Sequence, residues 1–408
     1  MERWFAAFLV SALLYSPQTS SAEALGFSTS GYIRYGYGHT RNRSTHTCYR
    51  AKGAHGASRF GNECNQYMDF QLKHDLGKKD GIYLHSEIGW DFYAEEGRTL
   101  ALVKRDERFL QLHGLGEVSL WAGRRTYRRK EAHLLDFKYS NLWGEGFGWE
   151  DAPLLRGHWA YAYLSRPAEE GDIHSRHITH DFRVYDLPID ILPVQSATLE
   201  LSANYAEMKP KPGYFDRQTG FEGFSLNAVL DQQFRPGVSH KLSLQTGSGA
   251  LADLDSRLSL RRDREGDPIS PDNYRTVRVV SESLIENLDR ASIMLTQLFE
   301  KRWVLGTQDS GFTWGSLGGR VKLYQSDAIN YVLDGSVDYV RDGEVGVSSL
   351  VKKLSVALQF SRGRGFYNRP ALRLYATYAE LDDDYALTTR EGLSESGVSC
   401  GIQFETWW

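Results

Sequence analysis

This chain has few cysteines and prolines and a small net charge, and these features exclude several classes of protein. The 408 residues include 3 cysteines and 11 prolines, and the formal net charge is −4. Three cysteines are too few for a small scaffold held together by disulfides. A chain without an excess of basic residues is not expected to bind nucleic acid. After the N-terminal leader, no apolar run approaches the roughly 20 residues that a membrane-spanning helix requires.

The chain is rich instead in aromatic residues and glycine, with 23 tyrosines, 10 tryptophans and 39 glycines. Tyrosine and tryptophan suit the boundary between lipid and water. The C-terminal segment alternates with a period of two, which indicates a strand between two unlike solvents. We therefore expect it to close a transmembrane β-barrel. The apolar face reads Trp408, Thr406, Phe404, Ile402, Cys400 and Val398, and the polar face reads Trp407, Glu405, Gln403, Gly401 and Ser399.

The first 24 residues have the pattern of a secretory signal peptide. A basic residue, Arg3, precedes the apolar run Trp4–Tyr15, and an A-x-A cleavage pattern follows at Ala22–Ala24. We expect residues 25–408 to form a single barrel domain in the outer membrane, exported after removal of this peptide.

Alternating segments recur along the whole chain and are separated by turn signals such as Phe234-Arg235-Pro236-Gly237. An all-β antiparallel barrel with spanning strands of about 9–11 residues would have about 16–18 of them, with long outer loops. Such a barrel encloses an aqueous lumen. The glycine-rich stretch Trp143–Trp149 is expected to fold back into the pore. No blade-length repeat supports a soluble propeller.

The cysteine and histidine residues are compatible with either a disulfide or a metal site. Cys48 and Cys64 are predicted to form a disulfide in a surface loop, and the alternative is a zinc site that adds His46 and His55. Cys400 is expected to face lipid. A second group of histidines lies in a predicted loop, and we expect its members to be solvated rather than to bind a metal. The group consists of His174, His177 and His180.

Several aromatic residues share a strand face with polar residues, and these are the candidates for function. Tyr32 lies on the face of Arg34, Tyr67 on the face of Asp69, and Trp407 on the polar face of the last strand. Rings on a water-filled wall suit sugars, whose C–H faces stack on aromatic rings. The alternative is that such rings belong to the aromatic girdle at the membrane interface.

Other functions are weighed against this one. A barrel enzyme such as a lipase needs a Ser–His pair, and the chain has no G-x-S-x-G motif and no convincing constellation, so no enzymatic activity and no cofactor are expected. A purely adhesive barrel would have no inward aromatic residues. A general or anion-leaning diffusion porin without saturable sugar binding remains the main alternative.

Several segments resemble the maltoporin (LamB-type) carbohydrate-specific porins. The resemblance runs the length of the chain after residue 24 and is looser over about 160–350. Its segments are Gly31–Arg34, Arg59–Cys64, Leu120–Arg125, His133–Phe137, Arg369–Arg373, Ala376–Ala379 and Phe404–Trp408.

The resemblance implies an 18-stranded barrel, assembled as a homotrimer in outer-membrane lipid, that lets oligosaccharides diffuse passively along an aromatic track. An inward-folded third loop would form an ionic constriction, and Cys48 and Cys64 match a first-loop disulfide. The matched track residues are Tyr32, Tyr67, Phe224, Tyr367 and Trp407. The matched polar-track and constriction residues are Arg34, Arg59, Asp69, Arg108, Arg129, Glu131 and Asp136.

Two departures separate this chain from the maltoporins. Lys138 stands where they carry a tyrosine at the constriction, and residues 94–103 hold no counterpart of the aromatic residue that their second loop contributes. A lysine at the narrowest point favours hydroxyl-rich or anionic sugars.

Overall fold

A computed structural model describes most of the chain. The residues it describes are 26–42, 46–59, 64–95, 101–168, 173–191, 193–215, 220–256, 258–262, 267–306, 311–343, 346–383 and 396–408. The predicted signal peptide lies outside them. Within these ranges no helix combines the length and the apolar composition needed to cross a membrane.

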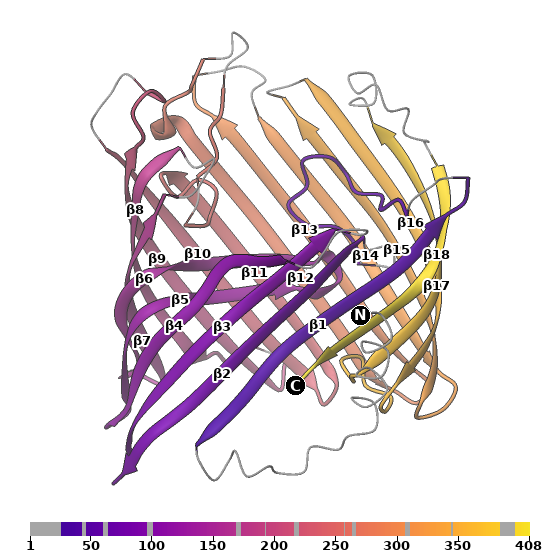
Figure 1. Ribbon diagram of the computed structural model, residues 1–408, viewed down its shortest axis with the longest axis horizontal. Helices are drawn as coiled ribbons and strands as arrows, with labels where there is room; N and C mark the ends of the chain where they lie inside the picture. Colours follow the sequence, from indigo (N-terminus) through magenta and orange to yellow (C-terminus); the bar gives the residue numbers. More distant parts are fainter. Residues whose placement is uncertain are drawn as a thin grey trace.

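In this part of the chain, eighteen strands form one antiparallel sheet (Figure 1). Each strand pairs with its neighbour in sequence, and β1 also pairs with β18, so the sheet closes into a barrel. The all-β barrel prediction is confirmed. The strands are β1 (Phe27–Thr40), β2 (Asn65–Lys79), β3 (Ile82–Glu95), β4 (Ala101–Leu115), β5 (Val118–Ala132), β6 (Phe137–Leu154), β7 (Gly157–Pro167), β8 (His174–Pro188), β9 (Ser196–Pro210), β10 (Phe221–Arg235), β11 (Val238–Gly249), β12 (Tyr274–Leu288), β13 (Ala291–Val304), β14 (Phe312–Tyr324), β15 (Ile329–Asp342), β16 (Val347–Ser361), β17 (Ala371–Asp383) and β18 (Ser396–Trp407).

Side chains alternate between an apolar outer face and a polar inner face. On β15, Leu333 is 46% exposed whereas Asp334 is 4% exposed. On β18 the outward Ile402 and Cys400 are exposed and the inward Gln403 and Glu405 are buried. The expected pattern of the last strand is confirmed. Because lipid offers no hydrogen-bond partners, this arrangement requires the closed ladder described above.

The two rims of the barrel differ in the length of their connections. At one rim most turns are short, such as Asp80–Gly81 between β2 and β3, where both residues have the positive φ that a tight hairpin needs. The opposite rim carries the longer connections, including residues 41–64 and 250–273. One longer segment at the short-turn rim, residues 362–370, contributes to the site described below.

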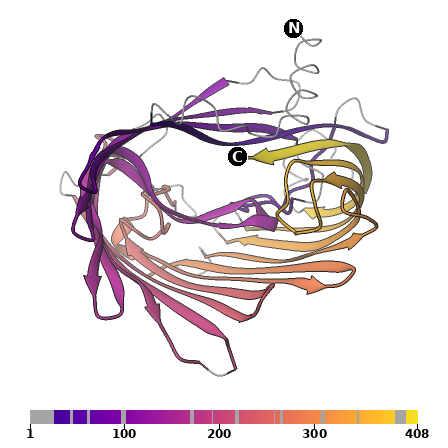
Figure 2. The same ribbon diagram turned by 90° about the horizontal axis from the view of Figure 1, so that it is seen from below.

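The C-terminal end of β5 and the N-terminal start of β6 leave the wall and cross the interior of the barrel (Figure 2). Their tip is a short 3-10 helix, η2 (His133–Leu135). Leu134 is buried against Met294 and Phe366, and Leu135 is also fully buried. The third loop is therefore folded inward, as expected. The stretch Trp143–Trp149 was the wrong segment for this role, since it pairs with β5 and β7 as part of β6.

Residues 46–59, the described part of the first loop, also lie inside the barrel rather than at its surface, which corrects the prediction of a surface loop. Tyr49 and Ala51 are buried in a cluster with wall residues such as Trp314. The backbone N–H of Arg59 donates to the carbonyl of Leu134 over 2.8 Å. The first loop thus holds the tip of the third loop from one side while the wall holds it from the other.

The outer face of β15 gives a direct test of membrane burial. Leu333→Arg is expected to destabilise the folded barrel by about 2–4 kcal/mol if this face meets the bilayer core, because lipid cannot solvate the guanidinium. Urea unfolding in lipid bilayers measures the difference, with Leu333→Ile as the matched control. An arginine variant as stable as the isoleucine variant would show that this face is not in lipid.

Candidate functional site

Four aromatic side chains form a continuous row along the lumen wall. The rings of Tyr67 and Tyr32 have centroids 5.8 Å apart, those of Tyr32 and Trp407 are stacked at 6.3 Å, and those of Trp407 and Tyr367 lie 6.4 Å apart. We call these four residues the aromatic row. It runs from Tyr67, which lies beside Lys138, to Tyr367 at the rim with short turns.

Barrel closure assembles this row. Tyr32 on β1 is the register partner of Trp407 on β18, and Tyr67 on β2 faces Arg34 across the β1–β2 ladder. Tyr367 comes from the segment between β16 and β17. Residues from both ends of the chain therefore become neighbours because the first and last strands pair.

A cation lies over each of the first three rings. The ammonium of Lys138 is 4.7 Å from the centroid of Tyr67, and the guanidinium carbons of Arg59 and Arg369 are 5.9 Å and 4.2 Å from Tyr32 and Trp407. Such contacts are attractive because the ring face is electron-rich. Burial lowers the pKa of Arg369 to about 10 while Glu405 opposes the shift, so the side chain stays charged at neutral pH.

Glu405 is the carboxylate around which the arginines of the lower lumen gather. It accepts hydrogen bonds from Arg59 at 2.7 Å, Arg369 at 2.9 Å and Arg373 at 3.1 Å. The hydroxyl of Tyr32 also donates to it over 2.9 Å. One buried carboxylate with three arginines leaves this part of the lumen positively charged.

The third loop contributes a second ionic contact at its tip. Both terminal nitrogens of Arg34 donate to Asp136 over 3.1 Å, and Arg34 also donates to Asn65 over 2.6 Å. Burial alone would raise the pKa of Asp136, but the positive charges of Arg34, Arg59 and Lys138 outweigh it and hold the pKa below its usual range. Asp136 therefore stays ionised and ties the third loop to β1.

The remaining predicted polar residues lie around the upper end of the row. Glu131 is 3.9 Å from Arg59. Arg129 is exposed in the lumen and lies among acidic groups that include Glu131 and Asp69. Lys138 is partly exposed beside Tyr67, and among the described residues no carboxylate lies within ion-pair distance of it. The passage beside the third loop is thus lined by charges of both signs.

Two predicted residues are not brought to this site. Phe224 is 57% exposed on the face of β10 that also exposes Leu226, and its ring contacts Tyr205. Arg108 lies on the face that exposes Leu110, and its side chain is 60% exposed beside Glu145. Both lie on the outer wall, so we leave them out of the proposed track and constriction.

Sequence reasoning did not select three residues that the structure places at the site. His133 at the third-loop tip lies with its ring centroid 5.3 Å from that of Tyr367 and 6.4 Å from that of Trp407. Burial, and then the charge of Arg59, lower the pKa of His133, so it is neutral at pH 7. Glu405 shares the polar face of Trp407, a signal that was available. Arg369 belongs to a segment that resembles the maltoporins, but it precedes a proline in an irregular stretch and has no strand-face pattern that would place it in the lumen.

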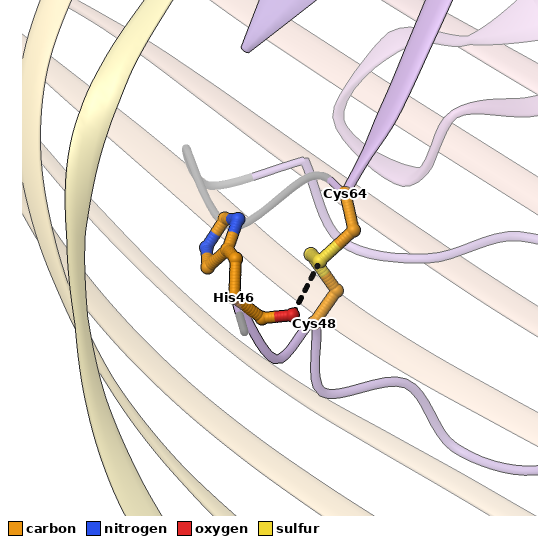
Figure 3. A group of neighbouring side chains, drawn as sticks. All are labelled: His46, Cys48 and Cys64. Atoms are coloured by element: carbon orange, nitrogen blue, oxygen red, sulfur yellow. Dashed lines mark hydrogen bonds between the residues drawn. A yellow bond between two sulfur atoms is a disulfide. The ribbon is translucent and has the colours of Figure 1, made fainter. Parts of the chain in front are cut away.

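The predicted disulfide between Cys48 and Cys64 is confirmed (Figure 3). The ring of His46 lies beside it, and the carbonyl oxygen of His46 is 3.6 Å from the Sγ of Cys64. The zinc alternative is wrong, because the two sulfurs that would bind the metal are bonded to each other. His55 lies elsewhere, with its ring centroid 6.1 Å from that of Trp314.

The group His174, His177 and His180 is not the solvated loop that was predicted. All three belong to β8, and the first two are fully buried with ring centroids 5.6 Å apart. His180 contacts Tyr161 through a hydrogen bond of 2.9 Å. Within the described residues, the three do not form a group that could share one metal ion.

Several solved structures align with most of this chain at very low sequence identity. OccK2 (OpdF) of Pseudomonas aeruginosa aligns with a TM-score of 0.51 and 10% identity over 93% of this chain and 97% of that chain. OmpF of Salmonella typhi, in complex with daunomycin, gives 0.49 and 9% over 93% and 97%. OpdK of Pseudomonas aeruginosa with vanillate gives 0.47 and 11% over 94% and 99%. At 10% identity the likeness to OccK2 concerns the fold alone.

A closed eighteen-strand barrel with an apolar outer wall, a polar lumen and an inward third loop defines a diffusion channel of the outer membrane, a porin. Within that class, the chain belongs to the LamB porin family, whose model matches residues 27–408. This is a family of channels and not of enzymes.

Removal of the Glu405 carboxylate, which three arginines share, tests its contribution to the stability of the barrel. Glu405→Ala is expected to destabilise the barrel by about 3–5 kcal/mol, because it leaves buried arginines without their partner. The matched control is Asp327→Ala, which breaks an ion pair with Arg364 at the rim with short turns, where the two side chains are 84% and 54% exposed, and is expected to cost about 0–1 kcal/mol. Unfolding in detergent with urea measures both, and equal losses would contradict the structural role of Glu405.

Proposed function

We propose that this porin is a sugar-selective channel, in which oligosaccharides bind saturably while they diffuse along the aromatic row. The observation that carries the proposal is the even spacing of the four rings, with centroids between 5.8 Å and 6.4 Å apart. A sugar presents apolar C–H faces at regular intervals, and stacked rings can support several of them at once. Membership of the LamB porin family supports sugars as the substrate class.

The polar side chains beside the row supply the second half of such a site. Sugar hydroxyls both donate and accept hydrogen bonds, and Arg34, Asp136 and Glu131 offer charged donors and acceptors along the same wall. Charge-assisted hydrogen bonds are stronger than neutral ones. Since Arg34 already bonds to Asp136, these two side chains hold their positions before a sugar arrives, which reduces the ordering cost of binding.

We further propose the assembly and targeting that the family resemblance implies. The channel acts as a homotrimer in outer-membrane lipid, and residues 1–24 are removed on export. No cofactor is required for passive diffusion, because the sugar moves down its own concentration gradient.

Sugar-dependent block of ion current through single channels in planar bilayers tests the row. Trp407→Ala is expected to raise the dissociation constant for a blocking oligosaccharide about tenfold, since a lost aromatic contact is worth about 1–1.5 kcal/mol. The matched control is Tyr37→Ala, which removes an exposed ring from the outer face of β1. If no oligosaccharide blocks the parent channel at millimolar concentration, the proposed function is wrong.

The general or anion-leaning diffusion porin stays as a second candidate because of Lys138 and the three arginines at Glu405. In the proposed channel, Lys138→Tyr removes an ammonium from the narrow passage and adds a ring. It is expected to change the ranking of sugars by blocking strength and to weaken anion preference, both measured in the same bilayers. An unchanged ranking would place Lys138 away from the constriction.

A further inference from the structure

A cavity lies at the rim with short turns, between Tyr367 at the end of the aromatic row and strands on the opposite side of the barrel. Its volume is about 350 Å³, and its walls are the ends of β9, β10, β11 and β12 together with Tyr367. Ligand pockets in proteins are about 300–1,000 Å³, so this cavity is large enough for a small ligand group. None of the residues that form its strand walls belongs to the aromatic row.

The side chains of the cavity suit a hydroxyl-rich ligand. Asp231 and Glu282 provide carboxylates, Lys241 provides an ammonium 3.5 Å from Asp231, and Thr198 provides a hydroxyl. Asp231 and Lys241 are 43% and 37% exposed, so a ligand in the cavity can reach them. Carboxylates accept hydrogen bonds from hydroxyl groups and the ammonium donates to them, so paired hydroxyls on adjacent carbons match this set.

Tyr367 connects the cavity to the aromatic row. Its ring lies 6.4 Å from that of Trp407 and also lines the cavity. Leu284, another wall residue, packs against the cluster of Leu134, Met294 and Phe366 that holds the third-loop tip. The cavity therefore combines one aromatic face, one apolar face and a polar strand wall.

The third loop fixes the position of this cavity. The backbone N–H of His133 donates to Glu282 over 3.0 Å, and Thr296 donates to the same carboxylate over 3.4 Å. One wall of the cavity is thus tied to the tip of the loop that narrows the channel. A preformed wall of this kind binds with less loss of conformational freedom.

We propose that this cavity is a separate sugar subsite, which binds the leading residue of an oligosaccharide after it passes Trp407 and turns across the lumen at Tyr367. The proposal rests on the proposed function and adds a position beyond the aromatic row. Its ligand is one neutral sugar residue with hydroxyls on adjacent carbons. The subsite extends the number of sugar residues that the channel can hold at once.

Current block by linear glucose oligosaccharides, from the disaccharide to the heptasaccharide, tests the subsite in the full-length channel. Asp231→Ala/Lys241→Ala removes both members of the ion pair. The dissociation constant is expected to rise about fivefold for the longest sugars only, since a lost hydrogen bond is worth about 1 kcal/mol. A second variant, Thr198→Phe, fills the cavity and is expected to give the same selective loss.

The matched control is Lys352→Ala/Glu380→Ala, which removes another ion pair between neighbouring strands and is expected to leave every dissociation constant unchanged. If sugars block the parent channel but the variants lose affinity equally for all sugar lengths, or for none, the subsite is wrong. The proposed role of the aromatic row then stands. A parent that no sugar blocks overturns the proposed function and the subsite with it.

Discussion

The pairing of β1 with β18 is the constraint on which the rest of the molecule depends. In a bilayer an unpaired backbone group costs several kcal/mol, so the sheet must close. Closure sets Tyr32 opposite Trp407 and Arg34 opposite Glu405 in one register. The aromatic row is therefore a by-product of the same hydrogen bonds that make the barrel stable. A change in that register by one residue would turn the row from water toward lipid.

The lumen also contains packed structure of its own, which is unusual for a wide barrel. The first and third loops bury apolar side chains such as Tyr49, Leu134 and Leu135 against the inner wall. Hydrogen bonds to carboxylates then fix the position of each loop, with Arg34 donating to Asp136 and Ser58 donating to Asp338 over 2.8 Å. The hydrophobic contacts supply most of the attraction. The charged contacts decide where the loops stop and so how wide the passage remains.

Local alternation in the sequence predicted much of the fold and part of the site. Period-two patterning identified the two faces of β18, and with them the inward position of Trp407. The same parity places Phe224 on the face of Leu226, which conflicts with a role in the lumen. Sequence could not show which segment crosses the lumen, because Trp143–Trp149 and His133–Leu135 differ in tertiary contacts rather than in local pattern. The buried histidines of β8 were missed for the same reason, since their burial comes from packing.

The origin of the aromatic row has a consequence for biosynthesis. Its rings come from positions 32, 67, 367 and 407, so the first and last parts of the chain must both be present before it exists. A chain that stalls or is cut short before β18 has neither a sealed wall nor a complete aromatic row. Closure of the wall and completion of the aromatic row therefore occur in one step, when the last strand pairs with the first, and an incomplete barrel has neither.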